Sequence, residues 1–161
     1  MTMLTSGDLE ADGSSIDTAH LEDLRRVFRG ELIPRGHAAY EGARRVWNGN
    51  IDRRPALIAR CGGVADVQRA VEFARLRGLL VSVRGGGHSA PGYGTNDGGL
   101  VIDMSPMKAI SVDTQGRTAR AEGGVLWREL EHKEPAKEPE RNGLSLHGYW
   151  LARFGRALVN Q

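Results

Sequence analysis

The chain has 161 residues, of which 40% are hydrophobic and 26% are charged, values typical of a globular domain or of part of a larger one. A formal net charge of +2, spread among acidic residues, gives no basis for binding nucleic acid or an anionic membrane surface. The single cysteine, Cys61, excludes an internal disulfide and a cysteine-rich metal site, and we predict no metal site. A polar N-terminus without a long apolar run predicts a cytoplasmic protein with neither signal peptide nor membrane span.

The first 34 residues are expected to hold a mobile N-terminus and one short helix. Residues 1–16 are rich in Ser, Thr, Gly and Asp, a composition typical of mobile chain ends. Asp17 or Thr18 can cap a helix over residues 20–29, and Gly30 can end it. The apolar residues of this helix recur on one face: Leu21, Leu24, Val27 and Phe28.

The clearest pattern is a strand, a helix and a second strand over residues 55–84. The strands are expected over 56–60 and 79–83, and the second reads as buried because it is apolar and β-branched. The helix is expected over 64–77, with polar residues such as Asp66 facing water. Its apolar stripe consists of Val64, Val67, Ala70, Val71 and Ala74. A β-α-β unit of this kind normally makes parallel strands.

The remaining elements are shorter. Residues 31–50 are interrupted by proline and glycine, and their periodicity does not distinguish a short helix from an ordered loop. A third buried strand is expected over 100–104, and a hairpin over 110–122 with its turn at 114–117. A further helix is expected to open at 125–131. Together these elements predict an α+β fold.

A glycine-rich stretch, Arg84-Gly85-Gly86-Gly87-His88-Ser89, follows the second strand of this unit. Three glycines without Cβ atoms allow successive N–H groups to turn toward one point, which suits an anion such as a phosphate. Arg84 adds a positive fork beside these groups. We therefore predict that this loop holds the pyrophosphate of a nucleotide cofactor.

Two known nucleotide-binding motifs, the P-loop and the dinucleotide fingerprint, differ from this loop. A P-loop requires a lysine after its glycines, and none is present. The loop matches the Gly-x-Gly-x-x-Ala dinucleotide fingerprint only formally, because Pro91 and Gly92 follow and prevent the helix that this motif must open. The glycine-rich loop is consistent with an anion-binding site between two strands, and also with an ordinary turn that binds no ligand.

The loop and its surroundings resemble the FAD-linked oxidases of the vanillyl-alcohol oxidase and p-cresol methylhydroxylase (PCMH) type, above all their berberine-bridge-enzyme-like branch. The stretch Arg84 to Ser89 after a strand is similar to the pyrophosphate loop of that family. Five other segments resemble further landmarks of the same family: Tyr40–Gly49, Arg54–Cys61, Asp66–Arg75, Leu100–Ser105 and Ala121–Trp127. The resemblance covers residues 35–130.

This resemblance implies that residues 35–130 are the N-terminal part of a PCMH-type FAD-binding domain, with FAD as the cofactor. The implied cofactor-binding residues are Arg84, Gly85, Gly86, Gly87, His88, Ser89, Ala90 and Gly92. By position, His88 is the histidine that can bond covalently to the 8α-methyl carbon of the flavin. The alternative for His88 is a loop histidine that donates one hydrogen bond. Asp103 either supports the loop from a strand end or caps a turn.

Other chemistry-bearing residues have simpler expected roles. Cys61 lies between the first strand and the first helix of the β-α-β unit, where a small core side chain fits. Trp47 and Trp127 are expected to pack rather than to stack on a bound ring. His132 and His147 lie outside the resemblance and are expected to be solvated.

The resemblance ends near residue 130. Residues 131–161 begin with a charged run cut by two prolines and do not resemble the continuation of the family. We interpret them as a divergent tail, which indicates a frameshift, a fusion or a gene-prediction error, with a natural short protein as the alternative. The expected protein is thus a truncated member without the family's substrate domain.

The implied function is that of an FAD-dependent oxidoreductase, incomplete in this chain. A hydride would pass from an alcohol, sugar or amine to the flavin, and oxygen would reoxidise it. No catalytic residue can be named, so whether this chain is an enzyme stays open. The alternatives are a non-catalytic fragment that binds flavin or another phosphate, alone or with a partner chain, and an unrelated binding module. The expected partner is a small-molecule substrate, with neither nucleic acid nor membrane.

Overall fold

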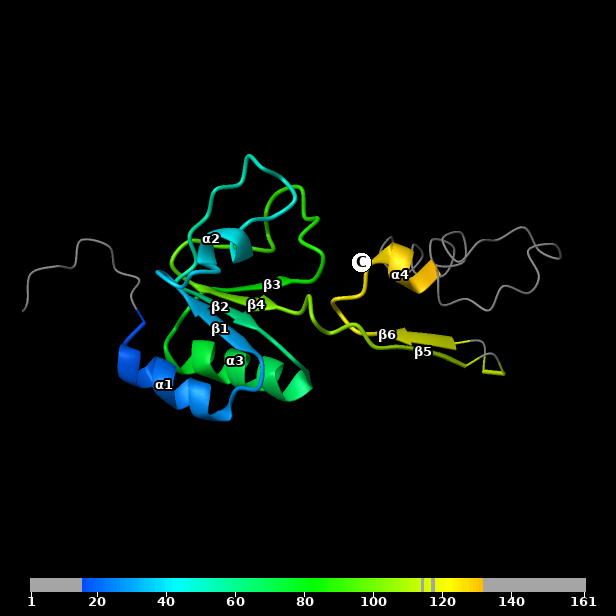
Figure 1. Cartoon of the computed structure of the whole chain (residues 1–161), viewed down its shortest axis with the longest axis horizontal. Helices are drawn as coiled ribbons and strands as arrows, with labels where there is room; N and C mark the ends of the chain where they lie inside the picture. The colour runs from blue at the N-terminus through cyan, green and yellow to red at the C-terminus, as the bar shows by residue number, and fades with distance from the viewer. Residues whose placement is uncertain (1–15, 114, 117, 132–161) are drawn as a thin grey trace, which may run out of the picture. The chain divides into compact units, whose positions relative to one another are not determined.

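The computed structural model describes residues 16–113, 115–116 and 118–131 (Figure 1). The predictions for residues 1–15 and for 132–161 therefore lie outside the described residues. The chain divides into two compact units. The first comprises the described residues of Met1–Ala109 together with Ala121–Val125, and the second those of Ile110–Arg120 and Leu126–Gln161.

A four-stranded sheet forms the centre of the first unit. Its strands, in spatial order, are β1 (Glu31–Pro34), β2 (Leu57–Arg60), β4 (Leu100–Asp103) and β3 (Val81–Arg84). Strand β1 runs antiparallel to β2, whereas β2, β4 and β3 are parallel. In the register of the parallel strands, Leu57 and Val81 both lie opposite Leu100. The α+β class expected from the sequence is confirmed.

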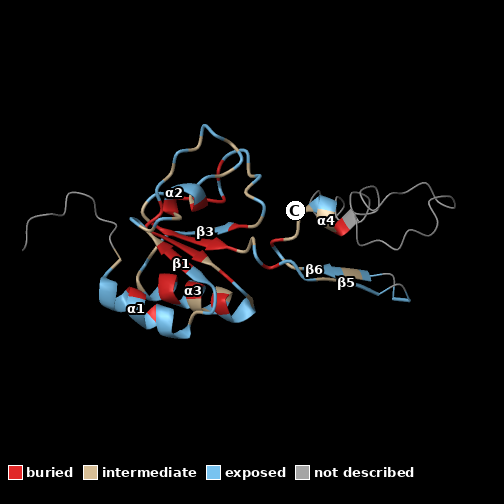
Figure 2. Cartoon of the chain, in the orientation of Figure 1, coloured by how far each residue is buried: buried red, intermediate tan, exposed pale blue. Residues whose placement is uncertain are grey.

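The strand pairing differs from the expected β-α-β unit in one respect. Strands β2 and β3 are parallel as expected, but β4 lies between them. Strand β3 is consequently an edge strand, and Val81 and Val83 are 38% and 53% exposed. The prediction of a buried strand over 79–83 is wrong, because the two central positions are occupied by β2 and β4. Figure 2 shows these central strands as the buried part of the sheet.

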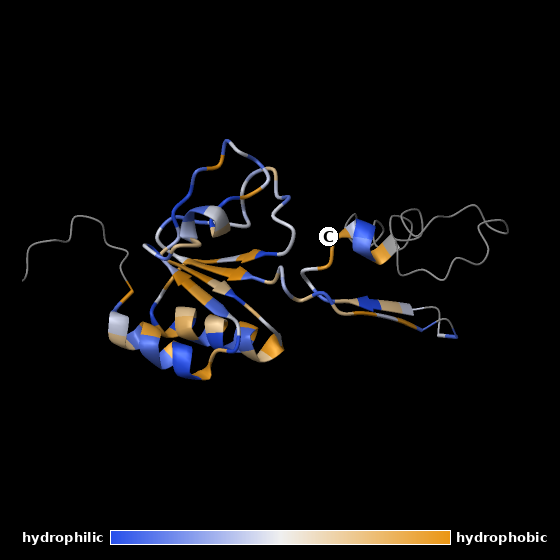
Figure 3. Cartoon of the chain, viewed as in Figure 1, coloured by the Kyte–Doolittle hydropathy of each residue, from blue (hydrophilic) through white to orange (hydrophobic). Residues whose placement is uncertain are grey.

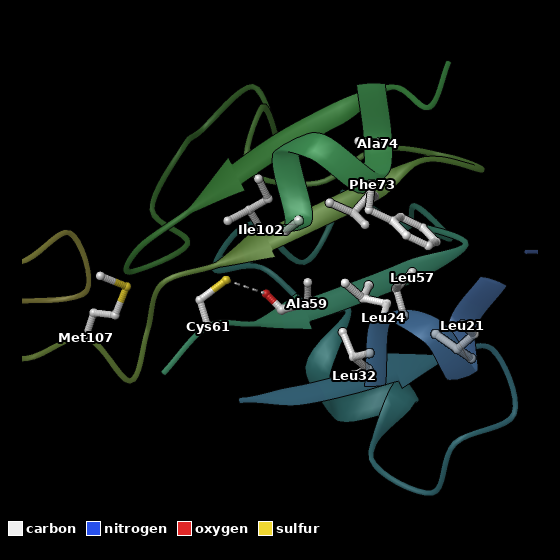
Figure 4. Packing of buried hydrophobic residues seen from close by; sticks show 12 residues of the cluster. Leu21, Leu24, Leu32, Leu57, Ala59, Cys61, Phe73, Ala74, Ile102 and Met107 are labelled. Atoms are coloured by element: carbon white, nitrogen blue, oxygen red, sulfur yellow. Dashed lines mark hydrogen bonds between the residues drawn. The ribbon is translucent and has the colours of Figure 1, made fainter. Parts of the chain in front are cut away.

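The two faces of the sheet are covered by different helices. Helices α1 (Thr18–Val27) and α3 (Val64–Leu76) lie on one face, and the short helix α2 (Tyr40–Ala43) lies on the other (Figure 1). Apolar side chains of the strands lie on both faces of the sheet, as the orange colour of the central strands in Figure 3 indicates. The larger cluster, shown in Figure 4, includes Leu21, Leu24, Leu57, Ala59, Phe73, Ala74 and Ile102. The smaller cluster contains Ile33, Tyr40, Ala43, Ile58 and Val101.

Alternation along β2 explains this division. Leu57 and Ala59 contribute to the larger cluster, whereas Ile58 between them contributes to the smaller one. Because successive side chains of a strand point to opposite faces, an unbroken apolar run fills two cores at once. The side chains of Leu21 and Leu24 belong to the same cluster as those of β2. Residues before position 35 therefore contribute to this core.

Helix α3 has the expected bounds within one residue, but its buried face is rotated from the expected one. Asp66 is 1% exposed, whereas Val64 and Val71 are 64% and 47% exposed. The prediction that Asp66 faces water is wrong. Its carboxylate accepts hydrogen bonds from the backbone N–H groups of Arg29, Gly30 and Gly62, each at 2.9 Å. Three donors compensate the burial of the carboxylate, and this explains its place inside the protein.

Two further sequence predictions for the first unit, the cap of α1 and the burial of Cys61, are confirmed. Asp17 caps α1, because its carboxylate accepts a hydrogen bond from Ala19 N at 2.8 Å. Cys61 is fully buried and its Sγ contacts Ala59 O at 3.4 Å (Figure 4). Among the described residues, no helix is long and apolar enough to cross a membrane.

The second unit contains the predicted hairpin and the start of the predicted helix. Strands β5 (Ile110–Asp113) and β6 (Thr118–Ala121) pair with each other, and α4 (Trp127–Glu131) follows. The Asp113 carboxylate accepts hydrogen bonds from the N–H groups of Gln115 and Gly116, which closes the turn. Trp127 is 54% exposed.

Candidate functional site

The glycine-rich loop lies at the carboxyl end of strand β3. Since β2, β4 and β3 are parallel, their carboxyl ends meet at one edge of the sheet. Open sheets with parallel strands bind ligands at this edge, where the loops leave the strands. The predicted cofactor-binding residues are therefore at the position in the fold where a ligand is expected.

The loop offers a row of unpaired backbone donors. Within the described part of the chain, none of the N–H groups from Gly85 to Ala90 donates a hydrogen bond. Gly87 has φ +72°, a left-handed conformation that glycine adopts without strain. Consecutive N–H groups in a loop of this kind bind anions without a charged side chain. We call the backbone from Gly85 to Ala90 the amide row.

Close backbone contact explains why glycine is needed at the start of the amide row. A Cβ atom on Gly85 would clash with the carbonyl oxygen of Gly123. Gly123 belongs to the segment 121–125, which is part of the same unit. Two of the landmarks found in the sequence, far apart along the chain, are thus in direct contact.

Arg84 lies inside the protein and is paired there. The residue is 7% exposed, and its Nη2 donates to Asp103 Oδ2 at 2.9 Å. Its Nη1 donates to the carbonyl of Arg45 at 3.3 Å. The guanidinium charge is therefore compensated by a carboxylate, and the side chain supports the loop from within.

Asp103 performs both of the roles considered for it. Besides Arg84, it accepts a hydrogen bond from Ser105 N at 3.0 Å, which caps the turn after β4. Burial raises the pKa of this carboxyl, but the charge of Arg84 and the hydrogen bonds from Arg84 and Ser105 outweigh burial and lower the pKa overall. Asp103 is therefore ionised at neutral pH and holds the base of the loop.

A second segment runs beside the amide row and was not anticipated as part of the site. We call residues 45–48 the strap. Trp47 N donates to Gly87 O at 3.1 Å, and Asn48 Nδ2 donates to Ala90 O at 2.8 Å. The sequence contained one indication of its importance: the strap belongs to the segment Tyr40–Gly49, which resembles a landmark of the family.

The strap brings an aromatic side chain to His88. The ring centroids of Trp47 and His88 are 6.1 Å apart, and the rings are inclined by 37°. Trp47 is 69% exposed, so the packing predicted for it is limited to this approach to His88. His88 itself is exposed.

The last residues of the predicted site, from Ser89 to Gly92, form a turn that is closed by hydrogen bonds. Gly92 N donates to Ser89 O at 3.0 Å, and Tyr93 N donates to Ser89 Oγ at 3.1 Å. Arg53 Nη1 donates to Gly92 O at 3.2 Å and to Thr95 O at 2.9 Å. Ser89 and Gly92 therefore hold the turn in place, and the free donors are those of the amide row.

These features define a glycine-rich loop with free backbone N–H groups and an exposed histidine at the carboxyl end of a parallel strand pair, and the chain has relatives with a known domain. A family model described as an FAD binding domain matches residues 55–137. An (R)-6-hydroxynicotine oxidase of Paenarthrobacter nicotinovorans is 44% identical over 110 residues, which are 68% of this chain and 24% of that protein. An FAD-linked oxidoreductase of Aspergillus terreus is 29% identical over 123 residues, which are 74% of this chain and 25% of that protein.

Solved structures give the same result. The crystal structure of 6-hydroxy-D-nicotine oxidase from Arthrobacter nicotinovorans matches with a TM-score of 0.63 and 42% identity, over 65% of this chain and 23% of that one. A berberine-bridge-enzyme-like protein of Physcomitrella patens matches with a TM-score of 0.56 and 30% identity, over 62% of this chain and 22% of that one. The chain belongs to the FAD-binding domain family, which confirms the resemblance seen in the sequence. It spans about a quarter of the length of these curated relatives.

The residues of the site fit the family's cofactor. The amide row leaves consecutive donors for the phosphate oxygens of FAD, and Gly85 and Gly87 keep the backbone free of side chains. Among the described residues there is no group of three or more His, Cys, Asp or Glu that could hold a metal ion.

Proposed function

We propose that this chain binds the pyrophosphate of FAD through the amide row and forms the flavin-binding part of an FAD-dependent oxidoreductase. The observation that supports this most strongly is the row of unpaired N–H groups at the carboxyl end of β3. Family membership supports FAD over other phosphate-containing ligands.

In the proposed complex, each residue of the site has a defined task. When bound, FAD supplies a ring that accepts a hydride from an alcohol, sugar or amine and returns the electrons to oxygen. The N–H groups of Gly86 and Gly87 donate to the phosphates. Arg84 and Asp103 fix the start of the loop through their 2.9 Å contact. A proton-accepting residue for the substrate is not assigned.

We also propose that His88 attaches the flavin covalently, as the family resemblance implied. An imidazole nitrogen of His88 would bond to the 8α-methyl carbon, and the imidazole N–H bond and one methyl C–H bond would break. The two protons and two electrons released would be taken up by the flavin and passed to oxygen, which would leave as hydrogen peroxide. The exposed position of His88 at the amide row supports this role.

A non-catalytic fragment that binds flavin or another phosphate is the second candidate. One observation favours it: the amide row needs only an anion as its ligand. A partner chain could then complete the site.

The visible spectrum separates these proposals. The purified protein, reconstituted with FAD, is precipitated with acid, and the flavin absorbance of the pellet is measured. We expect absorbance in the pellet of the wild type and of His20→Ala, a control at an exposed helix position, and none for His88→Ala. Flavin that is bound in solution but released by acid would contradict only the covalent bond. A wild type that binds no flavin at all would contradict the FAD proposal.

A further inference from the structure

The strap holds the loop on both sides of His88. The carbonyl before His88, that of Gly87, accepts from Trp47 N at 3.1 Å, and the carbonyl of Ala90 accepts from Asn48 Nδ2 at 2.8 Å. A Cβ atom added to Gly87 would lie 3.9 Å from the Cα of Val46, so the strap passes close to this glycine. The backbone that carries His88 is therefore fixed by a segment about 40 residues earlier in the chain.

The strap is itself attached to the buried ion pair. Arg84 Nη1 donates to Arg45 O at 3.3 Å, while Nη2 of the same guanidinium donates to Asp103 at 2.9 Å. Both ends of the strap are consequently connected to the loop, one through Arg84 and one through Asn48. This attachment brings the Trp47 side chain to the imidazole.

The burial of apolar surface does not explain why the two rings lie near each other. A tryptophan with 69% of its surface exposed buries little apolar area, yet its ring lies at 6.1 Å from that of His88, inclined by 37°. This separation is within the roughly 4.5–7 Å range in which aromatic rings interact. An exposed histidine in a glycine-rich loop would otherwise sample all its side-chain rotamers.

We infer that Trp47 is a positioning residue that restricts the orientation of the His88 imidazole. For the attachment reaction this inference rests on the proposed function. Bond formation requires the attacking nitrogen in a narrow range of positions, and a small misplacement of a reacting group slows a reaction strongly. Trp47 therefore accelerates covalent attachment without contributing a reacting atom.

The first test needs no flavin. In the NMR spectrum of the full-length protein, the imidazole C–H signals of His88, assigned by their loss in His88→Gln, should be shifted by the ring current of Trp47. Trp47→Ala should move these signals to the values of a free histidine, and Trp47→Phe should retain most of the shift. Leu76→Ala, at an exposed position of helix α3 in the same unit, serves as the control and should leave them unchanged. Unshifted signals in the wild type, or signals that Trp47→Ala does not move, would overturn the inference.

The second test measures attachment. With excess FAD, the rate at which acid-stable flavin accumulates should fall about tenfold in Trp47→Ala and less than about threefold in Trp47→Phe. Non-covalent FAD binding should be similar in all three proteins. An unchanged rate in Trp47→Ala would overturn the positioning role. If the wild type attaches no flavin, the proposed covalent bond fails, and the NMR result alone decides whether Trp47 orients His88.

Discussion

The ion pair between Arg84 and Asp103 is the residue-level feature on which the loop depends. Both side chains are almost fully buried, with 7% and 3% of their surface exposed. Removing one partner of a buried pair leaves an uncompensated charge and commonly costs about 3–5 kcal/mol. Asp103→Asn should therefore lower the free energy of unfolding by about 3 kcal/mol, measured by urea denaturation. Asp23→Asn breaks an exposed pair on α1 and should change it by less than about 1 kcal/mol.

The same pair predicts a pH dependence. The pKa of Asp103 is lower in the folded protein than its ordinary value of about 3.9 in an unfolded chain. The resulting stabilisation is fully present above about pH 4 and is lost as the pH falls through the folded-state pKa. Asp103→Asn should therefore flatten the acid side of the stability profile. A variant profile parallel to that of the wild type would contradict this assignment.

Cys61 shows how burial changes the chemistry of a single residue. The side chain is fully buried. Burial, and to a smaller extent the negative charges of Asp66 and Asp103, raise the pKa of its thiol to about 12. The thiol is thus protonated at neutral pH, and the thiolate is the reactive form. A thiol-specific reagent should label Cys61 only as fast as the protein unfolds, and immediately in guanidinium chloride. Rapid labelling of the folded protein would contradict the core position.

At the level of elements, strand β3 is the exposed apolar edge of the sheet in the described residues. Val83 is 53% exposed on a strand with one neighbour, and exposed apolar edges favour association between chains. Val83→Lys should reduce light scattering at high protein concentration and leave the melting temperature nearly unchanged. Val101→Lys, at a fully buried position of the neighbouring strand, should instead unfold the domain. Equal scattering by wild type and Val83→Lys would show that β3 is not the associating edge.

The sequence was informative where local patterns decide the structure. Strands β2 and β4, helix α3 and the β5–β6 hairpin were predicted, because apolar runs and turn residues determine them locally. Strand β1 was missed, because Pro34 and Gly36 interrupt its segment and its pairing with β2 joins residues distant along the chain. The position of β4 between β2 and β3 depends on pairing between distant segments, and no local pattern encodes it.

The candidate site was predictable in part for the same reason. The amide row was identified because its glycines are consecutive in the chain. The strap was not, because its hydrogen bonds join residues about 40 positions apart. The burial of Asp66 was equally hidden, since its donors include Arg29 and Gly30 from another segment. Charged residues are normally exposed, and only the folded backbone reveals the exception.

At the scale of the whole molecule, cofactor binding and folding should be coupled. A ligand that binds only the folded state stabilises it by an amount that grows with its concentration, about 2.7 kcal/mol at 100 times the dissociation constant. FAD should therefore raise the melting temperature of the wild type. Pyrophosphate alone should raise it by a smaller amount, because the amide row recognises the phosphates and not the flavin ring.

Two glycine substitutions test whether this stabilisation comes from the amide row. Gly87→Ala places a Cβ on a residue with φ +72°, which costs about 1 kcal/mol and moves the N–H groups away from one point. It should lower the melting temperature and remove the shift caused by FAD. Gly42→Ala is the matched control, because it lies in α2 with open space around its Cβ, and it should keep the full shift. If Gly87→Ala also keeps the full shift, FAD binds elsewhere, because a loop that no longer directs its N–H groups at the phosphates cannot stabilise the fold through them.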